Sequence, residues 1–139
     1  MPKHTLTFHL DAPPERVFDY IADVRNEAEW SKDIQSVELA GDGPIGSGTK
    51  FDCVYRGFGP VQLTITDFRR PERLGFLGDG PRIRMDFVMD LAPEGDGTSV
   101  TMALEMQPKG AFRLLTPMLA LGMPREMAKR PGQFAAVID

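Results

Sequence analysis

Regularly spaced prolines divide the middle of the chain into short segments. Six prolines recur every 10 to 16 residues between positions 44 and 108, and most have a glycine close by. Proline has no backbone N–H to donate to a sheet, so it collects at turns. Turn signals at intervals of roughly 8–12 residues are typical of a meandering antiparallel sheet. We therefore predict seven strands, at Thr5–Leu10, Ile34–Leu39, Gly48–Gly57, Val61–Arg69, Arg73–Leu77, Arg82–Leu91 and Ser99–Gln107.

Two short helices are predicted after the first strand. The segment Asp11-Ala-Pro-Pro-Glu contains prolines and an acidic residue, which favour the first turn of a helix. A second short helix over Asn26–Lys32 would carry Trp30. The first helix would present one apolar face, because its apolar residues are spaced three and four apart: Val17, Tyr20, Ile21 and Val24.

After Lys109 the pattern changes to helical spacing, with apolar residues at positions 112, 115, 119, 123 and 127. This predicts a long C-terminal helix with a broad apolar side. Pro117, Pro124 and Pro131 lie within it, and each removes a backbone hydrogen bond. Thr116 followed by Pro117 would suit a helix start. We therefore expect a kinked or segmented helix that weakens near Pro131.

Alternating apolar residues define one face of the sheet, because successive side chains of a strand point to opposite faces. The polar residues that alternate with them on the last two strands predict a solvated outer face. The C-terminal helix is the largest apolar surface left to cover the dry face. That face comprises Phe51, Cys53, Tyr55, Val61, Leu63, Ile65, Ile83, Met85, Phe87, Met89, Leu91, Val100, Met102, Leu104 and Met106.

The methionines of this face leave two interpretations open. Methionine fills irregular gaps in a core, and it also suits a deformable apolar cavity between sheet and helix. The polar groups of the face are the Tyr55 hydroxyl and the Cys53 thiol, with Tyr20 and Trp30 as additions at the rim. If a cavity exists, we predict that a ligand contacts Trp30, Phe51, Cys53, Tyr55, Leu63, Met85, Phe87, Met89, Met102, Leu104, Met106, Leu115, Leu119 and Met123.

Length and charge limit the protein class. The 139 residues predict one domain over 1–139, and the net charge of −4 disfavours nucleic acid as a partner. With Cys53 as the one cysteine, no intrachain disulfide can form. The first residues lack the apolar run of a secretory signal, and no stretch is apolar for long enough to span a bilayer. We expect a cytoplasmic protein without an integral membrane segment.

No catalytic or metal-binding constellation is visible. His4 and His9 do not have the spacing of a shared metal site, and Cys53 in an apolar strand is expected to be inert. The parity of Asp86 and Glu105 places both carboxylates on the outer face. No motif indicates a cofactor. The arginines at positions 69, 70, 73, 82 and 84 could meet an anionic partner, but a solvated pair of strands and their turn is the favoured explanation.

Several segments resemble the opening and middle of the polyketide cyclase/dehydrase family, which belongs to the START-like (SRPBCC) superfamily. They are Asp11–Asp23, Glu29–Trp30, Ile34–Glu38, Gly46–Thr49 and Ile65–Phe76. The resemblance implies an α+β helix-grip fold, in which a curved seven-stranded antiparallel sheet wraps round a C-terminal helix. It also implies an apolar cavity for lipids, quinones, plant hormones or polyketides. The matched motifs are structural, so they assign no catalytic residue.

Three hypotheses about function follow. The first is the binding or carriage of a small hydrophobic molecule, such as a lipid, a quinone or a polyketide-like compound. The second is a cyclase or dehydratase acting on an aromatic or polyketide substrate, which would use Tyr55, or Arg56 if a β-bulge reversed its orientation. The third is an assembly module whose apolar side meets a protein partner, with a homodimer as one form.

Overall fold

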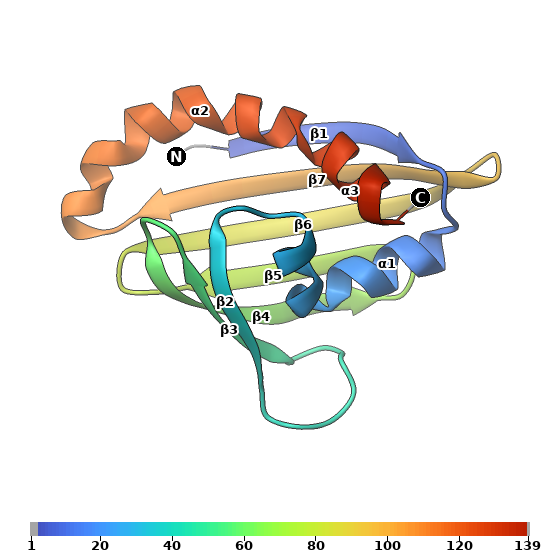
Figure 1. Ribbon diagram of the computed structural model, residues 1–139, viewed down its shortest axis with the longest axis horizontal. Coiled ribbons are helices and arrows are strands. Elements are labelled where there is room, and N and C mark those ends of the chain that lie inside the picture. The colour runs from blue at the N-terminus through green and yellow to red at the C-terminus, as the bar shows by residue number, and fades with distance from the viewer. Residues whose placement is uncertain (1–2, 139) are drawn as a thin grey trace.

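The computed structural model describes residues 3–138, which form one antiparallel sheet with helices on one of its faces (Figure 1). The strand order is β1-β7-β6-β5-β4-β3-β2. The predicted helix-grip architecture is therefore confirmed. In chain order the elements are β1 (Lys3–Leu10), α1 (Pro14–Ala22), the 3-10 helix η1 (Val24–Glu29), β2 (Ile34–Ala40), β3 (Lys50–Tyr55), β4 (Gly59–Arg69), β5 (Arg73–Asp79), β6 (Ile83–Glu94), β7 (Gly97–Pro108), the 3-10 helix η2 (Gly110–Leu115), α2 (Thr116–Ala128) and α3 (Arg130–Ile138).

The long hairpin of β6 and β7 extends beyond the predicted strand ends. Pro93 pairs with Thr98 inside the ladder, so only Gly95 and Asp96 connect the two strands. Gly95 has a φ of 61°, which a residue without a Cβ adopts at no steric cost. Pro60 also lies within a strand, as the second residue of β4. These prolines sit at strand ends, where one missing ladder donor is tolerated.

The dry face of the sheet agrees with the alternation. Ten of its fifteen predicted positions are buried: Phe51, Cys53, Val61, Leu63, Ile65, Ile83, Met89, Leu91, Val100 and Met102. The other five, Tyr55, Met85, Phe87, Leu104 and Met106, are half-buried. The outer face is solvated, and Arg69 and Arg73 form surface ion pairs there, Arg69 with Asp67 and Arg73 with Asp67 and Asp90. Arg70, in the turn between β4 and β5, pairs with Asp19 of α1.

The C-terminal helix is segmented, as predicted. α2 and α3 pack against β1 and are separated at Lys129. Pro117 and Pro131 each occupy the first turn of a segment, where their missing N–H costs no hydrogen bond. Pro124 lies inside α2 without ending it, whereas the break at Lys129 falls two residues before Pro131, near the predicted weak point. The predicted cap at Thr116 is wrong, because Leu115 precedes α2 and no side chain caps it.

The segment after β1 also differs from the prediction in its details. The second short helix begins earlier than expected, as the 3-10 helix η1, and Trp30 follows it as the C-terminal flanking residue. Asp23 starts η1 by accepting a hydrogen bond from the backbone N–H of Arg25. This turn directs η1 onto β2, which is an edge strand of the sheet.

Candidate ligand-binding site

A cavity of about 420 Å³ lies between the sheet and the C-terminal helices. Its size falls within the range of small-molecule sites. The sheet contributes Tyr55, Leu63, Phe76, Gly78, Met85, Phe87, Met102, Leu104 and Met106, and the β3–β4 turn adds Arg56 and Phe58. The C-terminal segments contribute Met118, Leu119, Gly122, Met123, Glu126, Met127, Arg130 and Phe134. The third wall, from α1, η1 and the turn after η1, consists of Tyr20, Ile21, Asp23, Val24, Glu27, Trp30, Ser31 and Asp33.

Most of the residues predicted from the sequence line this cavity. They are Trp30, Tyr55, Leu63, Met85, Phe87, Met102, Leu104, Met106, Leu119 and Met123. Their role in ligand binding stays a prediction, since the geometry only places them together. Tyr20, expected at the rim, is also part of the lining and donates its hydroxyl hydrogen to Glu29 Oε1 at 3.1 Å.

Four of the predicted residues do not line the cavity. Phe51, Cys53 and Met89 are at most 2% exposed and belong to the core. They point to the predicted face, but other side chains cover them. Leu115 ends η2 and is half-buried outside the lining. Periodicity determines the face on which a residue lies, whereas the neighbouring elements determine whether open space remains in front of it.

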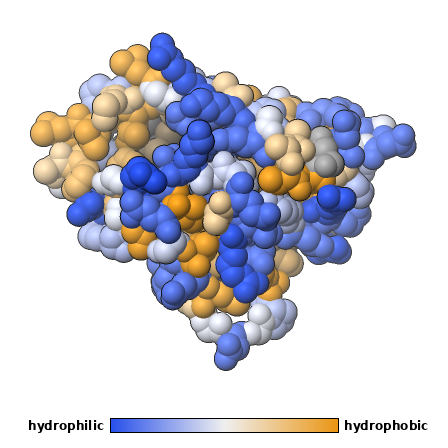
Figure 2. All heavy atoms as spheres, in the orientation of Figure 1, coloured by the Kyte–Doolittle hydropathy of each residue, from blue (hydrophilic) through white to orange (hydrophobic). Residues whose placement is uncertain are grey.

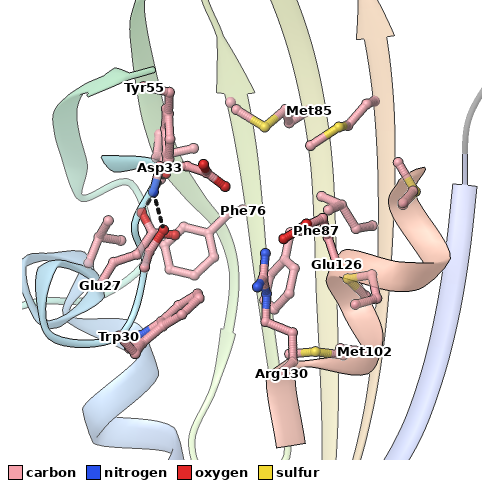
Figure 3. Close-up of a pocket in the computed structure, with 18 of the residues that line it drawn as sticks. Glu27, Trp30, Asp33, Tyr55, Phe76, Met85, Phe87, Met102, Glu126 and Arg130 are labelled. Atoms are coloured by element: carbon pink, nitrogen blue, oxygen red, sulfur yellow. Dashed lines mark hydrogen bonds between the residues drawn. The ribbon is translucent and has the colours of Figure 1, made fainter. Parts of the chain in front are cut away.

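The polar end of the cavity contains a carboxyl–phenol pair (Figure 3). Tyr55 donates its hydroxyl hydrogen to Glu27 Oε2 at 2.6 Å. Burial raises the pKa of the Glu27 carboxyl, because an ionised carboxylate is poorly solvated among apolar groups. Burial, reinforced by the charge of Glu27, holds the pKa of Tyr55 well above its usual range. Both shifts favour the protonated form of the group concerned, at a point where a ligand's polar group could meet the pair.

The Cys53 thiol next to this pair is buried and forms no disulfide. Burial raises the pKa of Cys53 to about 12, with the charge of Glu27 as the second cause. The thiolate is the nucleophilic form of cysteine, so this side chain acts as a small apolar group. The sequence-based expectation that Cys53 is inert agrees with this environment.

A cation faces the cavity from the opposite side. Arg130, the first residue of α3, carries its guanidinium carbon 4.9 Å from the centroid of the Trp30 ring. Its Nη1 donates to Gln133 Oε1 at 2.8 Å, and burial lowers its pKa. Trp30 is fixed in turn by an edge contact with Phe134, with ring centroids 4.8 Å apart. In Figure 3, Glu27 and Arg130 enter the cavity from different elements.

Sequence reasoning missed this polar end. The two polar side chains expected from the sequence, Tyr55 and Cys53, belong to the sheet face. The cavity is also lined by Glu27 from η1 and Arg130 from α3. Neither residue carries a local signal, since isolated charged residues on short helices are usually solvated. Phe76 could have been found, because it alternates with buried Leu74 within the predicted strand Arg73–Leu77.

The remaining polar candidates lie at the surface. His9 contacts Asp11 and Glu94, and both hydrogen bonds raise its pKa. Asp86 and Glu105 face each other in the ladder between β6 and β7, on the outer face. Among residues 3–138, no group of three His, Cys, Asp or Glu side chains could hold a metal ion. No helix in this range is long and apolar enough to cross a membrane.

A sheet wrapped round a segmented C-terminal helix, with an apolar cavity between them, places the protein in the helix-grip class of START-like proteins. The chain belongs to the family described as polyketide cyclase / dehydrase and lipid transport, whose model matches residues 1–139. The comparison with curated proteins finds no match.

Solved structures share the fold at low sequence identity. A Bacillus halodurans protein is 19% identical, with a TM-score of 0.74 and coverage of 100% of this chain and 98% of that one. A START superfamily protein from Mycobacterium smegmatis is 13% identical, with a TM-score of 0.74 and coverage of 98% and 96%. The di-domain ARO/CYC BexL of the BE-7585A biosynthetic pathway is 15% identical, with a TM-score of 0.70; the match covers 99% of this chain and 50% of BexL. At such identities, the likeness concerns the fold.

Proposed function

We propose that the protein binds a small hydrophobic molecule with one polar end, of the lipid, quinone or polyketide-like kind, in the cavity between sheet and C-terminal helices. The observation that carries the proposal is the cavity itself, about 420 Å³ in volume and lined largely by apolar side chains. Burial of apolar ligand surface at about 25 cal/mol per Å² would supply most of the affinity, less the cost of immobilising the ligand.

The wall of β6 and β7 suits an apolar ligand body. Met85, Phe87, Leu104 and Met106 line the cavity and are half-buried, whereas Met89, Leu91 and Val100 on the same two strands are buried outside the lining. Methionine side chains are flexible and polarizable, so this wall can adapt to ligands of different shape. We expect a ligand's apolar part to lie against these residues.

The opposite end suits a polar group. Tyr55 and Glu27 lie within hydrogen-bond distance of each other, and Arg130 is held over the Trp30 ring. A few placed polar groups in an otherwise apolar pocket fix a ligand's orientation. We expect a hydroxyl, carbonyl or carboxyl oxygen of the ligand to lie between these side chains.

The test is a pair of adjacent substitutions on β7. Leu104 faces the cavity, whereas Ala103 points to the outer face. Titration with the neutral fluorescent probe N-phenyl-1-naphthylamine should give saturable binding to the wild type. Leu104→Asn should weaken probe binding by roughly tenfold, because the polar amide removes apolar contact with the probe worth about 1.4 kcal/mol. Ala103→Asn is the matched control. A wild type that takes up no apolar probe, or equal affinities for both variants, would contradict the proposal.

A second candidate function, cyclase or dehydratase activity in the same cavity, is favoured by the Glu27–Tyr55 pair. A carboxyl group with a raised pKa inside a pocket can donate a proton to a leaving hydroxyl group. In a dehydration of a β-hydroxyketone, the Glu27 carboxylate would remove the α-hydrogen, and the carboxyl group so formed would return that proton to the hydroxyl, which leaves as water when the C–O bond breaks. Arg130 would then stabilise the negative charge that develops on the carbonyl oxygen.

This second candidate is tested with 4-hydroxy-4-phenylbutan-2-one, whose dehydration product is followed by absorbance. Activity should fall by about 10²-fold in Glu27→Gln, the usual size of a general acid–base contribution. Tyr55→Phe should lower it less, since Glu27 remains. Arg84→Gln, on the outer face, is the control. No turnover above the uncatalysed rate, or turnover unchanged in Glu27→Gln, would count against this candidate.

A further inference from the structure

Three large apolar side chains are exposed on the segment that closes the cavity. Leu114 is 85% exposed, Met118 60% and Leu121 80%. Their spacing of four and three residues places them on one side of the helical path through η2 and α2. In the view of Figure 2, hydrophobic residues gather where this segment begins. We call Leu114, Met118 and Leu121 the apolar row.

The segment that carries the apolar row is basic, and the two acidic groups at its ends are paired with lysines: Asp79 with Lys109, and Glu126 with Lys129. The segment 109–125 contains Lys109, Arg113 and Arg125 and no acidic residue, in a chain of net charge −4. Arg113 and Arg125 are exposed, while Lys109 pairs with Asp79. Arg82 adds another basic group at this end, with its guanidinium carbon 5.2 Å from the ring centroid of Phe112 in η2. The local charge therefore has the opposite sign to that of the whole chain.

The apolar row also adjoins the cavity. Met118 belongs both to the exposed row and to the cavity lining. Leu114 and Leu121 are not part of the lining, so the row is a separate surface beside the cavity rather than an extension of it. Exposed apolar residues flanked by basic ones are typical of helices that lie in the surface of a bilayer.

We propose that η2 and the first half of α2 dock on an anionic membrane surface through the apolar row, with Arg113 and Arg125 facing the lipid phosphates. The apolar side chains enter the boundary between headgroups and acyl chains. The arginines are attracted by the negative surface potential of anionic lipids. Docking places Met118, and with it the edge of the cavity, against the apolar layer.

Charge favours a membrane over a second copy of the chain as the occupant of this surface. In a two-fold symmetric dimer, the same patch would meet itself and would bring Arg113 and Arg125 of both copies close together. Like charges facing each other across an interface oppose association. An anionic lipid surface complements both the apolar row and its basic flanks.

Vesicle co-sedimentation tests the inference independently of any ligand. The wild type should bind vesicles of phosphatidylcholine containing about one-third phosphatidylglycerol at least ~10-fold more strongly than vesicles of phosphatidylcholine alone. Added salt should weaken this binding, because it screens exposed charges. The double substitution Leu114→Ser/Leu121→Ser should reduce binding by ~10-fold or more. Both positions lie outside the cavity and the core, so N-phenyl-1-naphthylamine should still bind.

Two double variants that each remove two positive charges test the role of the arginines. Arg113→Gln/Arg125→Gln should abolish the preference for anionic vesicles, whereas Arg16→Gln/Arg69→Gln removes the same charge elsewhere and should not. Equal binding by the wild type and the Leu114→Ser/Leu121→Ser variant would overturn the inference, as would a wild type that ignores vesicles. A dimer in sedimentation that this variant converts to monomers would assign the surface to a second copy instead. If the wild type does not bind N-phenyl-1-naphthylamine, the proposed function is contradicted, but the test of vesicle binding still stands.

Discussion

Gly122 offers a way to fill the cavity without disturbing the fold. It lies in the middle of α2 and lines the cavity together with Leu119 and Met123. A Cβ built at this position meets no atom within 4 Å. Substitution to leucine should therefore place a side chain in open space, whereas most other lining positions already carry one.

The expected magnitudes follow from the helix and from the cavity. Replacing a mid-helix glycine by alanine stabilises a helix by about 0.8–1.0 kcal/mol, so Gly122→Ala should raise the free energy of unfolding by that amount. Leucine adds three carbons beyond the alanine Cβ. At about 0.8 kcal/mol for each displaced methylene contact of the ligand, Gly122→Leu should weaken binding by ~2.4 kcal/mol, roughly fiftyfold.

The assay combines thermal or urea unfolding with titration of N-phenyl-1-naphthylamine. Gly122→Ala should be more stable than the wild type and bind the probe with nearly the same affinity. Gly122→Leu should be as stable as Gly122→Ala but bind the probe poorly. Ala120→Leu, on the exposed side of the same helix, is the control for added apolar surface. Wild-type affinity in Gly122→Leu would show that ligands bind elsewhere, and a destabilised Gly122→Ala would show that this position is not open.

Three further predictions concern stability. The raised pKa of Glu27 means that the folded state holds this proton more tightly, so its contribution to stability falls as the pH rises above 4.5. Glu27→Gln should therefore be more stable than the wild type at pH 7 and lose that advantage near pH 4, as urea unfolding will show; a less stable variant at pH 7 would contradict this. Thr98 is fully buried and donates its hydroxyl hydrogen to the Ala12 carbonyl at 2.7 Å, so Thr98→Val should cost about 1–3 kcal/mol in the same assay, whereas Thr98→Ser should lose less. The hydrogen bond from Arg70 lowers the pKa of Asp19, so Asp19→Asn should cost at most ~1 kcal/mol at pH 7, and this difference should vanish as the pH falls below 3.8; a difference that persists in acid would exclude the ion pair as its cause.

The strands could be predicted because their signals are local. Alternation in β6 places Met85, Phe87 and Met89 on one face, and the structure agrees. The ends of β6 and β7 were missed because Pro93 and Gly95 both favour a loop. Pairing between the two strands nevertheless extends the ladder past the proline, so the turn contracts to two residues.

The cavity could be predicted only in part, for a reason that two methionines make clear. Met89 and Met102 are directly opposite each other in the ladder and point to the same face. Both are almost fully buried, yet Met102 lines the cavity and Met89 does not. The sequence pattern is the same for both residues. The difference comes from the elements packed above them, which local periodicity does not describe.

The amino-acid sequence by itself determined the order of strands and helices, the dry face of the sheet and the segmentation of the last helix. These properties depend on side-chain alternation and on the backbone chemistry of proline and glycine, which act over a few residues. Only the tertiary structure decided where open space remains and what lies at its polar end. Glu27 and Arg130 are far apart in the chain and line the same cavity because η1 packs on one edge strand, β2, and α3 packs on the other, β1, with Trp30 and Phe134 in contact between them. Packing between elements that are distant in the chain brings Glu27 and Arg130 to one cavity, and the same packing buries them and so shifts their pKa values.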